Sequence, residues 1–409
     1  MRTTTVKNET APEAVIPAIR EPAMQPLWCP IPTAIHPDRR EFDERNAGWR
    51  ARFLADSPEA EQGGADRGAC HPELAQVHDA AWCWAHEQNL IPQPAIEESL
   101  MRTQPELLAC LAFPDAELER VMLVSEWLMW AFVIDDRFDD GPGGLDPAEC
   151  GQVIEDLIAV LDGGATHSPL EVALADLREQ TCRGRSQAWL RQFRRHTADY
   201  LWSYYVQAVG YAAGHGPTMG EFLSYRCDSV AMQALLDLHE LMVDIDLPER
   251  ARMLPAYRAL RQAVTLHSTL INDLRSYGKE TTTGHVDNIM KVLEQQHHLD
   301  HTTAVEHTTD LLAKTVQQIR TAQQQLLDDH MVAALSHGAR GALRQCAEDY
   351  PAIAQADHDF HDRAARYAGG TDFRAGDRSV TSSRAWEGAA KLDDSVLVIL
   401  AGLPQECWL

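Results

Sequence analysis

Apolar side chains recur every three or four residues along most of the chain after about Glu41. This spacing places them on one face of an α-helix, so it predicts a series of amphipathic helices. We expect helices over residues 75–89, 95–111, 115–138, 147–161, 190–211, 219–243, 255–279, 286–296 and 304–330. Segments that contain glycine and proline, among them 141–144 and 214–217, interrupt the pattern and are typical of loops.

Strand-like alternation of apolar and polar residues is nearly absent, and no repeat recurs at a fixed period. The chain is therefore predicted to fold as an all-α bundle in one domain rather than as a solenoid. We place this domain at residues 26–370, after a leader over 1–25 that is expected to be disordered. The tail over 371–409 is polar and ends in a short apolar run, so docking on the body and loose order both stay open.

The composition narrows the range of partners and locations. The 409 residues carry a formal net charge of -25, which argues against nucleic acid or an anionic membrane surface as a general partner. No apolar run approaches the ~20 residues of a membrane span, and the first residues lack the apolar core of a signal peptide. The 9 cysteines are scattered singly, which favours a reducing cytoplasm over a disulfide framework. We therefore expect a cytoplasmic protein.

The strongest chemical signal is an acidic cluster at the end of an apolar helix. Residues 123–134 are mostly apolar, and the chain then reads Asp135-Asp136-Arg137-Phe138-Asp139-Asp140. Residues four apart share a helix face, so these carboxylates repel one another unless a cation neutralises them. Magnesium prefers a few carboxylates together with phosphate oxygens. The alternative is a solvated helix end, although acidic groups are unfavourable there. A calcium loop is excluded, because two of its ligand positions fall on Phe138 and Pro147.

A second group of oxygen ligands is predicted on the helix over 255–279 and the residue that follows it. Asn272, Ser276 and Glu280 are spaced four and four, so an amide, a hydroxyl and a carboxylate line one helix face. Such a trio suits a second magnesium site. Taken alone the pattern is weak, because a surface helix can carry it by chance.

Together, the two motifs resemble the DDxxD and NSE motifs of bacterial class I terpene synthases. Three further positions match that family: Arg226 as the diphosphate-sensing arginine, Lys279 directly before Glu280, and Arg366-Tyr367 as the C-terminal RY pair. The resemblance spans roughly residues 28–367. It implies the class I terpenoid synthase α-helical barrel, with the two motifs on facing helices at its mouth.

The resemblance also implies the chemistry. Three Mg²⁺ ions are expected, held by Asp135, Asp136, Asp139, Asn272, Ser276 and Glu280. The diphosphate is expected to contact Arg226, Lys279, Arg366 and Tyr367. Asp135 and Arg226 would then act in ionisation, while Phe132 and Phe360 line a dry pocket whose aromatic faces stabilise a carbocation.

Two points depart from the pattern or stay open. The effector region falls on Ser229 and Val230, and Ser229 replaces an aspartate that the family often carries. Trp130, Trp202, Tyr204 and Tyr205 are further candidates for the pocket wall, with ordinary core packing as the alternative.

The predicted function is a magnesium-dependent terpene cyclase. Farnesyl diphosphate is the expected substrate, geranylgeranyl diphosphate is the rival, and geranyl diphosphate comes third. A chain-elongating prenyltransferase shares the fold and the first motif, but it carries a second aspartate-rich motif where this chain has Asn272, Ser276 and Glu280. A catalytically silent isoprenoid-binding protein is the alternative from another class. Whether the chain forms a homodimer stays open.

Overall fold

The computed structural model describes residues 70–139, 146–214, 216–283 and 287–367, and these residues are helical with no strand among them. The predicted all-α class is therefore confirmed. The predicted leader over 1–25 and tail over 371–409 lie outside the described residues. The helices are α2 (Leu74–Glu87), α3 (Pro94–Thr103), α4 (Pro105–Ala112), α5 (Leu118–Asp139), α6 (Pro147–Leu161), α7 (Pro169–Cys182), α8 (Gln187–Ala213), α9 (Met219–Ser229), α10 (Met232–Met242), α11 (Glu249–Arg252), α12 (Pro255–Thr283), α13 (Ile289–Gln296), α14 (His301–Asp328), α15 (His330–Ala333), α16 (His337–Arg363) and the short 3-10 turn η3 (Ala365–Tyr367).

Short polar side chains cap the N-terminal ends of several of these helices. The Ser186 hydroxyl accepts from the backbone N–H of Trp189, and the Asp146 carboxylate accepts from Ala148. Thr218 and Glu221 form a reciprocal capping box at the start of α9. Each cap satisfies backbone donors that have no partner inside the helix, and each contributes about 1 kcal/mol.

Two of the expected helices are broken in the structure. The range 95–111 divides into α3 and α4 at Gln104 (φ 56), and the range 219–243 divides into α9 and α10 at Ala231 (φ 54). A left-handed conformation costs a non-glycine residue about 1 kcal/mol, so tertiary contacts must impose both breaks. Helices α7 and α16 were not among the expected ranges. Helix α16 carries Pro351 in its interior, which is a residue that normally predicts a helix end.

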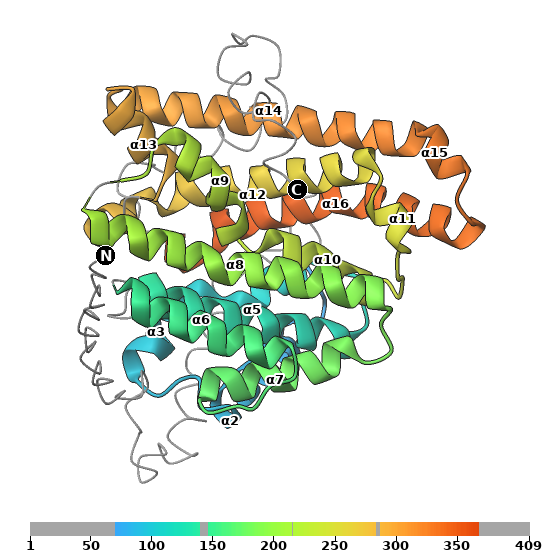
Figure 1. Cartoon of the computed structure of the whole chain (residues 1–409), viewed down its shortest axis with the longest axis horizontal. Coiled ribbons are helices and arrows are strands. Elements are labelled where there is room, and N and C mark those ends of the chain that lie inside the picture. The colour runs from blue at the N-terminus through green and yellow to red at the C-terminus, as the bar shows by residue number, and fades with distance from the viewer. Residues whose placement is uncertain (1–69, 140–145, 215, 284–286, 368–409) are drawn as a thin grey trace, which may run out of the picture.

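The long helices pack side by side in a bundle (Figure 1). Their buried apolar side chains form a large core and a smaller cluster between α9, α12, α13 and α14. Helix α12 packs against α14 and α16, α8 packs against α6 and α9, and α5 packs against α2 and α4. The largest side chains buried in this core include Trp82, Trp130 and Trp189. Trp130 and Trp189 also donate their indole N–H to the carbonyl oxygens of Leu170 and Asp237, whereas the buried indole N–H of Trp82 has no hydrogen-bond partner among the described residues. No helix in the described part of the chain is long and apolar enough to cross a membrane.

Candidate active site

An enclosed cavity of about 120 Å³ lies inside the bundle. Its walls come from α4, α5, α8, α9, α10, α12, α16 and η3, together with the segment that joins α9 to α10 and Asp287 before α13. Apolar surface comes from Leu128, Phe132, Leu235, Phe360 and several smaller or neighbouring apolar side chains, and the rest of the lining is polar or charged. The cavity therefore combines the two kinds of surface that a molecule with an apolar chain and a charged head requires.

Nearly all of the sequence-predicted site residues converge on this cavity, although they come from five separate elements and the segment that joins α9 to α10. Those that line it are Phe132, Asp135, Arg226, Ser229, Val230, Asn272, Ser276, Lys279, Glu280, Phe360, Arg366 and Tyr367. Asp136 is not among the lining residues, but it pairs with Arg366. Asp139 ends α5, and its side chain lies outside the described residues.

The aspartates at the end of α5 are neutralised by an arginine from the far end of the chain. The Arg366 guanidinium donates to Asp135 Oδ2 at 2.6 Å and to Asp136 Oδ1 at 2.8 Å. Ser99 donates to the other oxygen of Asp136, and Tyr204 donates to Asp135 Oδ1 at 3.2 Å. Burial disfavours the charge of Arg366, but Asp136 and Asp135 outweigh burial and hold its pKa well above the ordinary value. The positive charge of Arg366 therefore offsets the repulsion that was expected between these carboxylates.

The oxygen face predicted on α12 is present, and other helices hold two of its three members. Asn272 Oδ1 accepts from Arg226 Nη2 at 2.8 Å, and Glu280 Oε2 accepts from Asn288 Nδ2 at 2.9 Å. The Ser276 hydroxyl oxygen is buried and has no hydrogen-bond partner among the described residues. A buried hydroxyl without a partner is costly, so it points to a ligand of this face.

These residues fit a hard divalent cation. An amide oxygen, a hydroxyl oxygen and a carboxylate are ligands that Mg²⁺ accepts. The three groups lie on successive turns of the same face of α12. Within the described ranges, no group of three or more His, Cys, Asp or Glu side chains is placed to hold a metal by itself. A metal here would therefore need Asn272 and Ser276 as well as a carboxylate, which does not favour a transition-metal centre.

Arg226 lies at the centre of a buried polar network beside the break between α9 and α10. Its Nε donates to Asp273 Oδ1 at 2.9 Å, and its Nη1 donates to the Ser229 hydroxyl. Burial disfavours its charge, but Asp273 and Glu280 outweigh burial and raise its pKa. Ser229 thus contacts the arginine directly, in the effector region that the sequence identified. The break itself exposes Val230 and Ala231 to the cavity.

The aromatic candidates separate into two groups. Phe132 and Phe360 both line the cavity with ring centroids 6.2 Å apart, and Arg366 lies 5.6 Å from the centroid of Phe132. Tyr204 also lines the cavity. Trp130 is packed in the core and Tyr205 is exposed, so for these two the core or surface interpretation holds.

Several cavity residues were not identified from the sequence, and three of them make contacts or have shifted pKa values that bear on the site. Tyr200 contacts the Tyr204 hydroxyl at 2.9 Å. Asp357 is buried, and burial raises its pKa to about 7. His361 is buried one turn later on α16, and burial lowers its pKa to about 4. The sequence signal available for Asp357 and His361 was their spacing of four residues just before Arg366, but α16 itself was not predicted.

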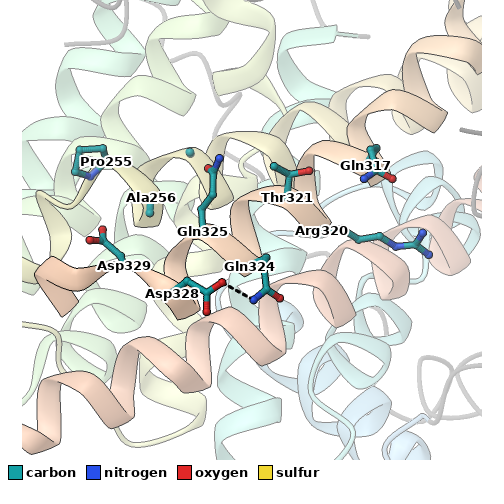
Figure 2. A pocket seen from close by; sticks show the side chains of 10 residues that line it. Pro255, Ala256, Gln317, Arg320, Thr321, Gln324, Gln325, Asp328 and Asp329 are labelled. Carbon is teal, nitrogen blue, oxygen red and sulfur yellow. Dashed lines mark hydrogen bonds between the residues drawn. The ribbon is translucent and has the colours of Figure 1, made fainter. Parts of the chain in front are cut away.

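A larger open groove lies elsewhere on the surface (Figure 2). It has a volume of about 830 Å³ and runs between the start of α12 and the second half of α14. Its side chains are mostly amides and other polar groups, with Arg320 as the single cation, and Gln324 donates to Asp328 at 2.7 Å. The groove brings together none of the predicted site residues. The smaller cavity is therefore the candidate active site.

Comparisons with known proteins identify relatives of the whole helical domain. Residues 126–318 match the family model described as terpene synthase family 2, C-terminal metal binding. The chain is similar to (2Z,6E)-hedycaryol synthase of Kitasatospora setae, with 30% identity over 302 residues that cover 73% of this chain and 89% of the relative. It is also similar to (+)-T-muurolol synthase of Roseiflexus castenholzii, with 31% identity over 61% of this chain and 77% of the relative. Among solved structures, hedycaryol synthase in complex with nerolidol superposes with a TM-score of 0.63 and 26% identity, covering 73% of this chain and 98% of the other.

Proposed function

The chain belongs to the bacterial class I terpene synthase family, and we propose from this premise that it ionises farnesyl diphosphate with Mg²⁺ and cyclises the resulting carbocation to a sesquiterpene. The enzyme class, a terpene cyclase, follows from the family and from relatives named as synthases. The choice of substrate draws support from the muurolol synthase relative, which is described as cyclising (2E,6E)-farnesyl diphosphate.

The observation that carries the proposal is the convergence of three kinds of group on one enclosed cavity. Carboxylates come from α5, an oxygen face comes from α12, and cationic groups come from α9, α12 and η3. Phe132 and Phe360 supply the apolar wall beside them. A prenyl diphosphate bound with metal needs such a site: its head is highly charged and requires cations, which the oxygen ligands would hold, and its hydrocarbon tail requires the apolar wall.

We assign the metal ligands to the two faces. Asp135, with Asp136 and Asp139 beside it on α5, would hold magnesium on one side, and Asn272, Ser276 and Glu280 would hold it on the other. Three ions are proposed, by analogy with the family. When bound, they would neutralise the negative charge that grows on the diphosphate as its bond to carbon breaks.

The chain's own cationic residues would bind and orient the diphosphate. Arg226 and Arg366 present planar guanidinium groups that suit two phosphate oxygens at once, and Lys279 adds a third positive charge. Tyr367 also lines the cavity, and its hydroxyl would donate a further hydrogen bond. Arg366 would then exchange its contacts with Asp135 and Asp136 for contacts with the substrate, which would free these carboxylates for metal.

The apolar wall would protect the carbocation after the diphosphate leaves. The enclosed shape limits entry of water, which would otherwise quench the cation. The faces of Phe132 and Phe360 can stabilise positive charge that passes between them. We propose further that Ser229 and Val230 couple Arg226 to this step, since the backbone at the α9–α10 break lines the cavity beside them.

Incubation with prenyl diphosphates of three chain lengths tests the proposal. The protein is given geranyl, farnesyl or geranylgeranyl diphosphate with Mg²⁺ or with EDTA, and released diphosphate and volatile hydrocarbons are measured by a coupled assay and mass spectrometry. We expect Mg²⁺-dependent cyclic C15 products from the farnesyl substrate and none from Asp135→Ala. Cyclic C20 products alone would make the enzyme a diterpene cyclase, and linear elongated diphosphates would make it a prenyltransferase.

Two coarser expectations accompany the proposal. We infer that the catalytic domain extends over residues 26–370, of which the structure describes the part from residue 70 to 367. We also infer a cytoplasmic location, supported by cysteines that are scattered singly along the chain rather than in a disulfide framework.

A further inference from the structure

We propose that His361 is a positioning residue that fixes the orientation of the Asn272 side-chain amide and so presents Asn272 Oδ1 to the metal. The inference rests on the proposed function, because it takes Asn272 as a magnesium ligand. An asparagine amide has two chemically different ends, and only the oxygen can bind Mg²⁺. A mechanism that selects one orientation therefore matters for the affinity of this site.

A second contact of His361 determines which of its ring nitrogens donates a hydrogen bond and which accepts one. Its Nδ1 lies 2.7 Å from the backbone carbonyl oxygen of Asp357, one turn earlier on α16. A carbonyl oxygen can only accept, so Nδ1 must carry a proton. The other ring nitrogen, Nε2, is then free to act as the acceptor. Nε2 lies 3.2 Å from Asn272 Nδ2, which can only donate.

The opposite end of the amide is determined independently. Asn272 Oδ1 lies 2.8 Å from Arg226 Nη2, and a guanidinium can only donate. Turning the amide over would place its N–H groups against Arg226 and its oxygen against the lone pair of His361. Both hydrogen bonds would be lost and two repulsive contacts would replace them. Two helices on either side of α12 thus specify the same orientation.

When the diphosphate is bound, the contact from His361 becomes more important for Asn272 than the contact from Arg226. We propose that Arg226 binds the diphosphate, and a donor engaged there offers less to Asn272. The contact from His361 to the amide nitrogen leaves Oδ1 untouched, so it can persist while the oxygen binds metal. This is the arrangement in which an outer group orients a ligand without competing for it.

The imidazole ring is itself held in place. Only 4% of the residue surface is exposed. The ring centroid lies 4.6 Å from the ring of Tyr367 and 5.3 Å from the ring of Phe360. Rotation of His361 away from Asn272 would disturb both neighbours, so the acceptor remains directed at the amide.

Binding of Mg²⁺ in the presence of inorganic pyrophosphate tests the role without relying on turnover. The variants are His361→Phe, which keeps an aromatic ring but removes the acceptor, and His361→Gln, whose amide oxygen can replace Nε2. The matched control is His358→Phe, three residues earlier on the same helix, where the ring pairs with His267 and does not contact Asn272. Calorimetry gives the magnesium affinity, and circular dichroism checks that each variant is folded.

We expect His361→Phe to weaken magnesium binding by about 10-fold or more, which is the usual cost of removing a group that orients a ligand. His361→Gln should restore most of the affinity, and His358→Phe should change it by less than about 2-fold. The inference is wrong if folded His361→Phe binds magnesium within about 2-fold of the unaltered enzyme. It is also wrong if folded His361→Gln does not recover magnesium affinity. If the unaltered enzyme itself binds no Mg²⁺ with pyrophosphate, the metal assignment in the proposed function is wrong.

A spectroscopic measurement provides an independent check. Two-bond ¹H–¹⁵N correlation of histidine-labelled protein reports which ring nitrogen carries the proton. The His361 signal, assigned by its loss in His361→Phe, should show a protonated Nδ1 and a bare Nε2. A proton on Nε2 would refute the acceptor role, whatever the binding measurements give.

Discussion

Arg366 offers the sharpest test of how the site is built. Its guanidinium contacts Asp135 at 2.6 Å, Asp136 at 2.8 Å and the Thr103 hydroxyl at 3.1 Å. Its side chain and that of Asp136 are each only 9% exposed, while Asp135 is 26% exposed. Replacing Arg366 by alanine would leave two adjacent carboxylates in a largely buried place without a cation.

The magnitude follows from this burial. Removing one partner of a buried ion pair costs about 3–5 kcal/mol. Because Asp135 retains contact with solvent, we expect the lower end, about 3 kcal/mol. For a chain of 409 residues that corresponds to a fall in Tm of about 3–4 °C. Millimolar Mg²⁺ should recover part of the loss, because it binds the freed carboxylates in the folded state only.

The assay is thermal unfolding followed by circular dichroism, in EDTA and in Mg²⁺, for the unaltered enzyme and for Arg366→Ala. Arg363→Ala is the control, since the structure shows no ion pair of Arg363 with the other described residues. Mg²⁺ should raise Tm more in Arg366→Ala than in the unaltered enzyme. A loss below about 1 kcal/mol in EDTA, or an equal response of both proteins to Mg²⁺, would refute the view that Arg366 substitutes for metal at these aspartates.

Three further predictions concern the metal face, the pocket wall and pH. Glu280→Ala should lower the rate of diphosphate release by about 100-fold or more at fixed Mg²⁺, because a charged ligand is lost; a fall below about 5-fold in a steady-state assay would contradict its assignment. Phe360→Ala should change the ratio of products seen by mass spectrometry more than it changes the rate of diphosphate release, since the side chain lines the cavity and is not expected to contact the diphosphate; an unchanged product ratio would return Phe360 to core packing. Burial, with a smaller contribution from Asp176, raises the pKa of Glu126 from 4.5 to about 8. The contribution of this side chain to stability is therefore fully present below pH 4.5 and is lost as pH rises from there through 8. Glu126→Gln should therefore leave stability unchanged near pH 4 and raise it by about 1–3 kcal/mol near pH 9, which urea unfolding at the two pH values would detect.

Local patterns were enough to predict much of the helical framework. The range 147–161 coincides with α6, and the bounds of α8 and α12 fall within a few residues of those expected. These helices have strong periodicity, and their breakers and caps are close in sequence, so short-range physics determines them. The breaks at Gln104 and Ala231 are different, because neither residue favours a left-handed backbone. Only the packing of the flanking helices can impose that conformation.

The candidate site divides in the same way. The spacing of Asn272, Ser276 and Glu280 predicted a shared helix face, because a helix brings residues four apart together regardless of the rest of the fold. The pairing of Arg366 with Asp135 joins residues 231 positions apart and needs the whole bundle to form. His361 was missed for the same reason, since its significance comes from a contact across 89 residues.

The sequence by itself therefore determined the all-α class, the two groups of oxygen-bearing side chains that we propose as ligands, and the family that they resemble. The tertiary structure decided which groups face one another: the arginine that neutralises the aspartates, the histidine that orients Asn272, and the enclosed cavity between them. The physical reason is the sequence separation over which each kind of interaction acts. Helix periodicity and ligand spacing depend on neighbours within a few residues, whereas burial, hydrogen-bond partners and pKa shifts depend on atoms that only folding brings together.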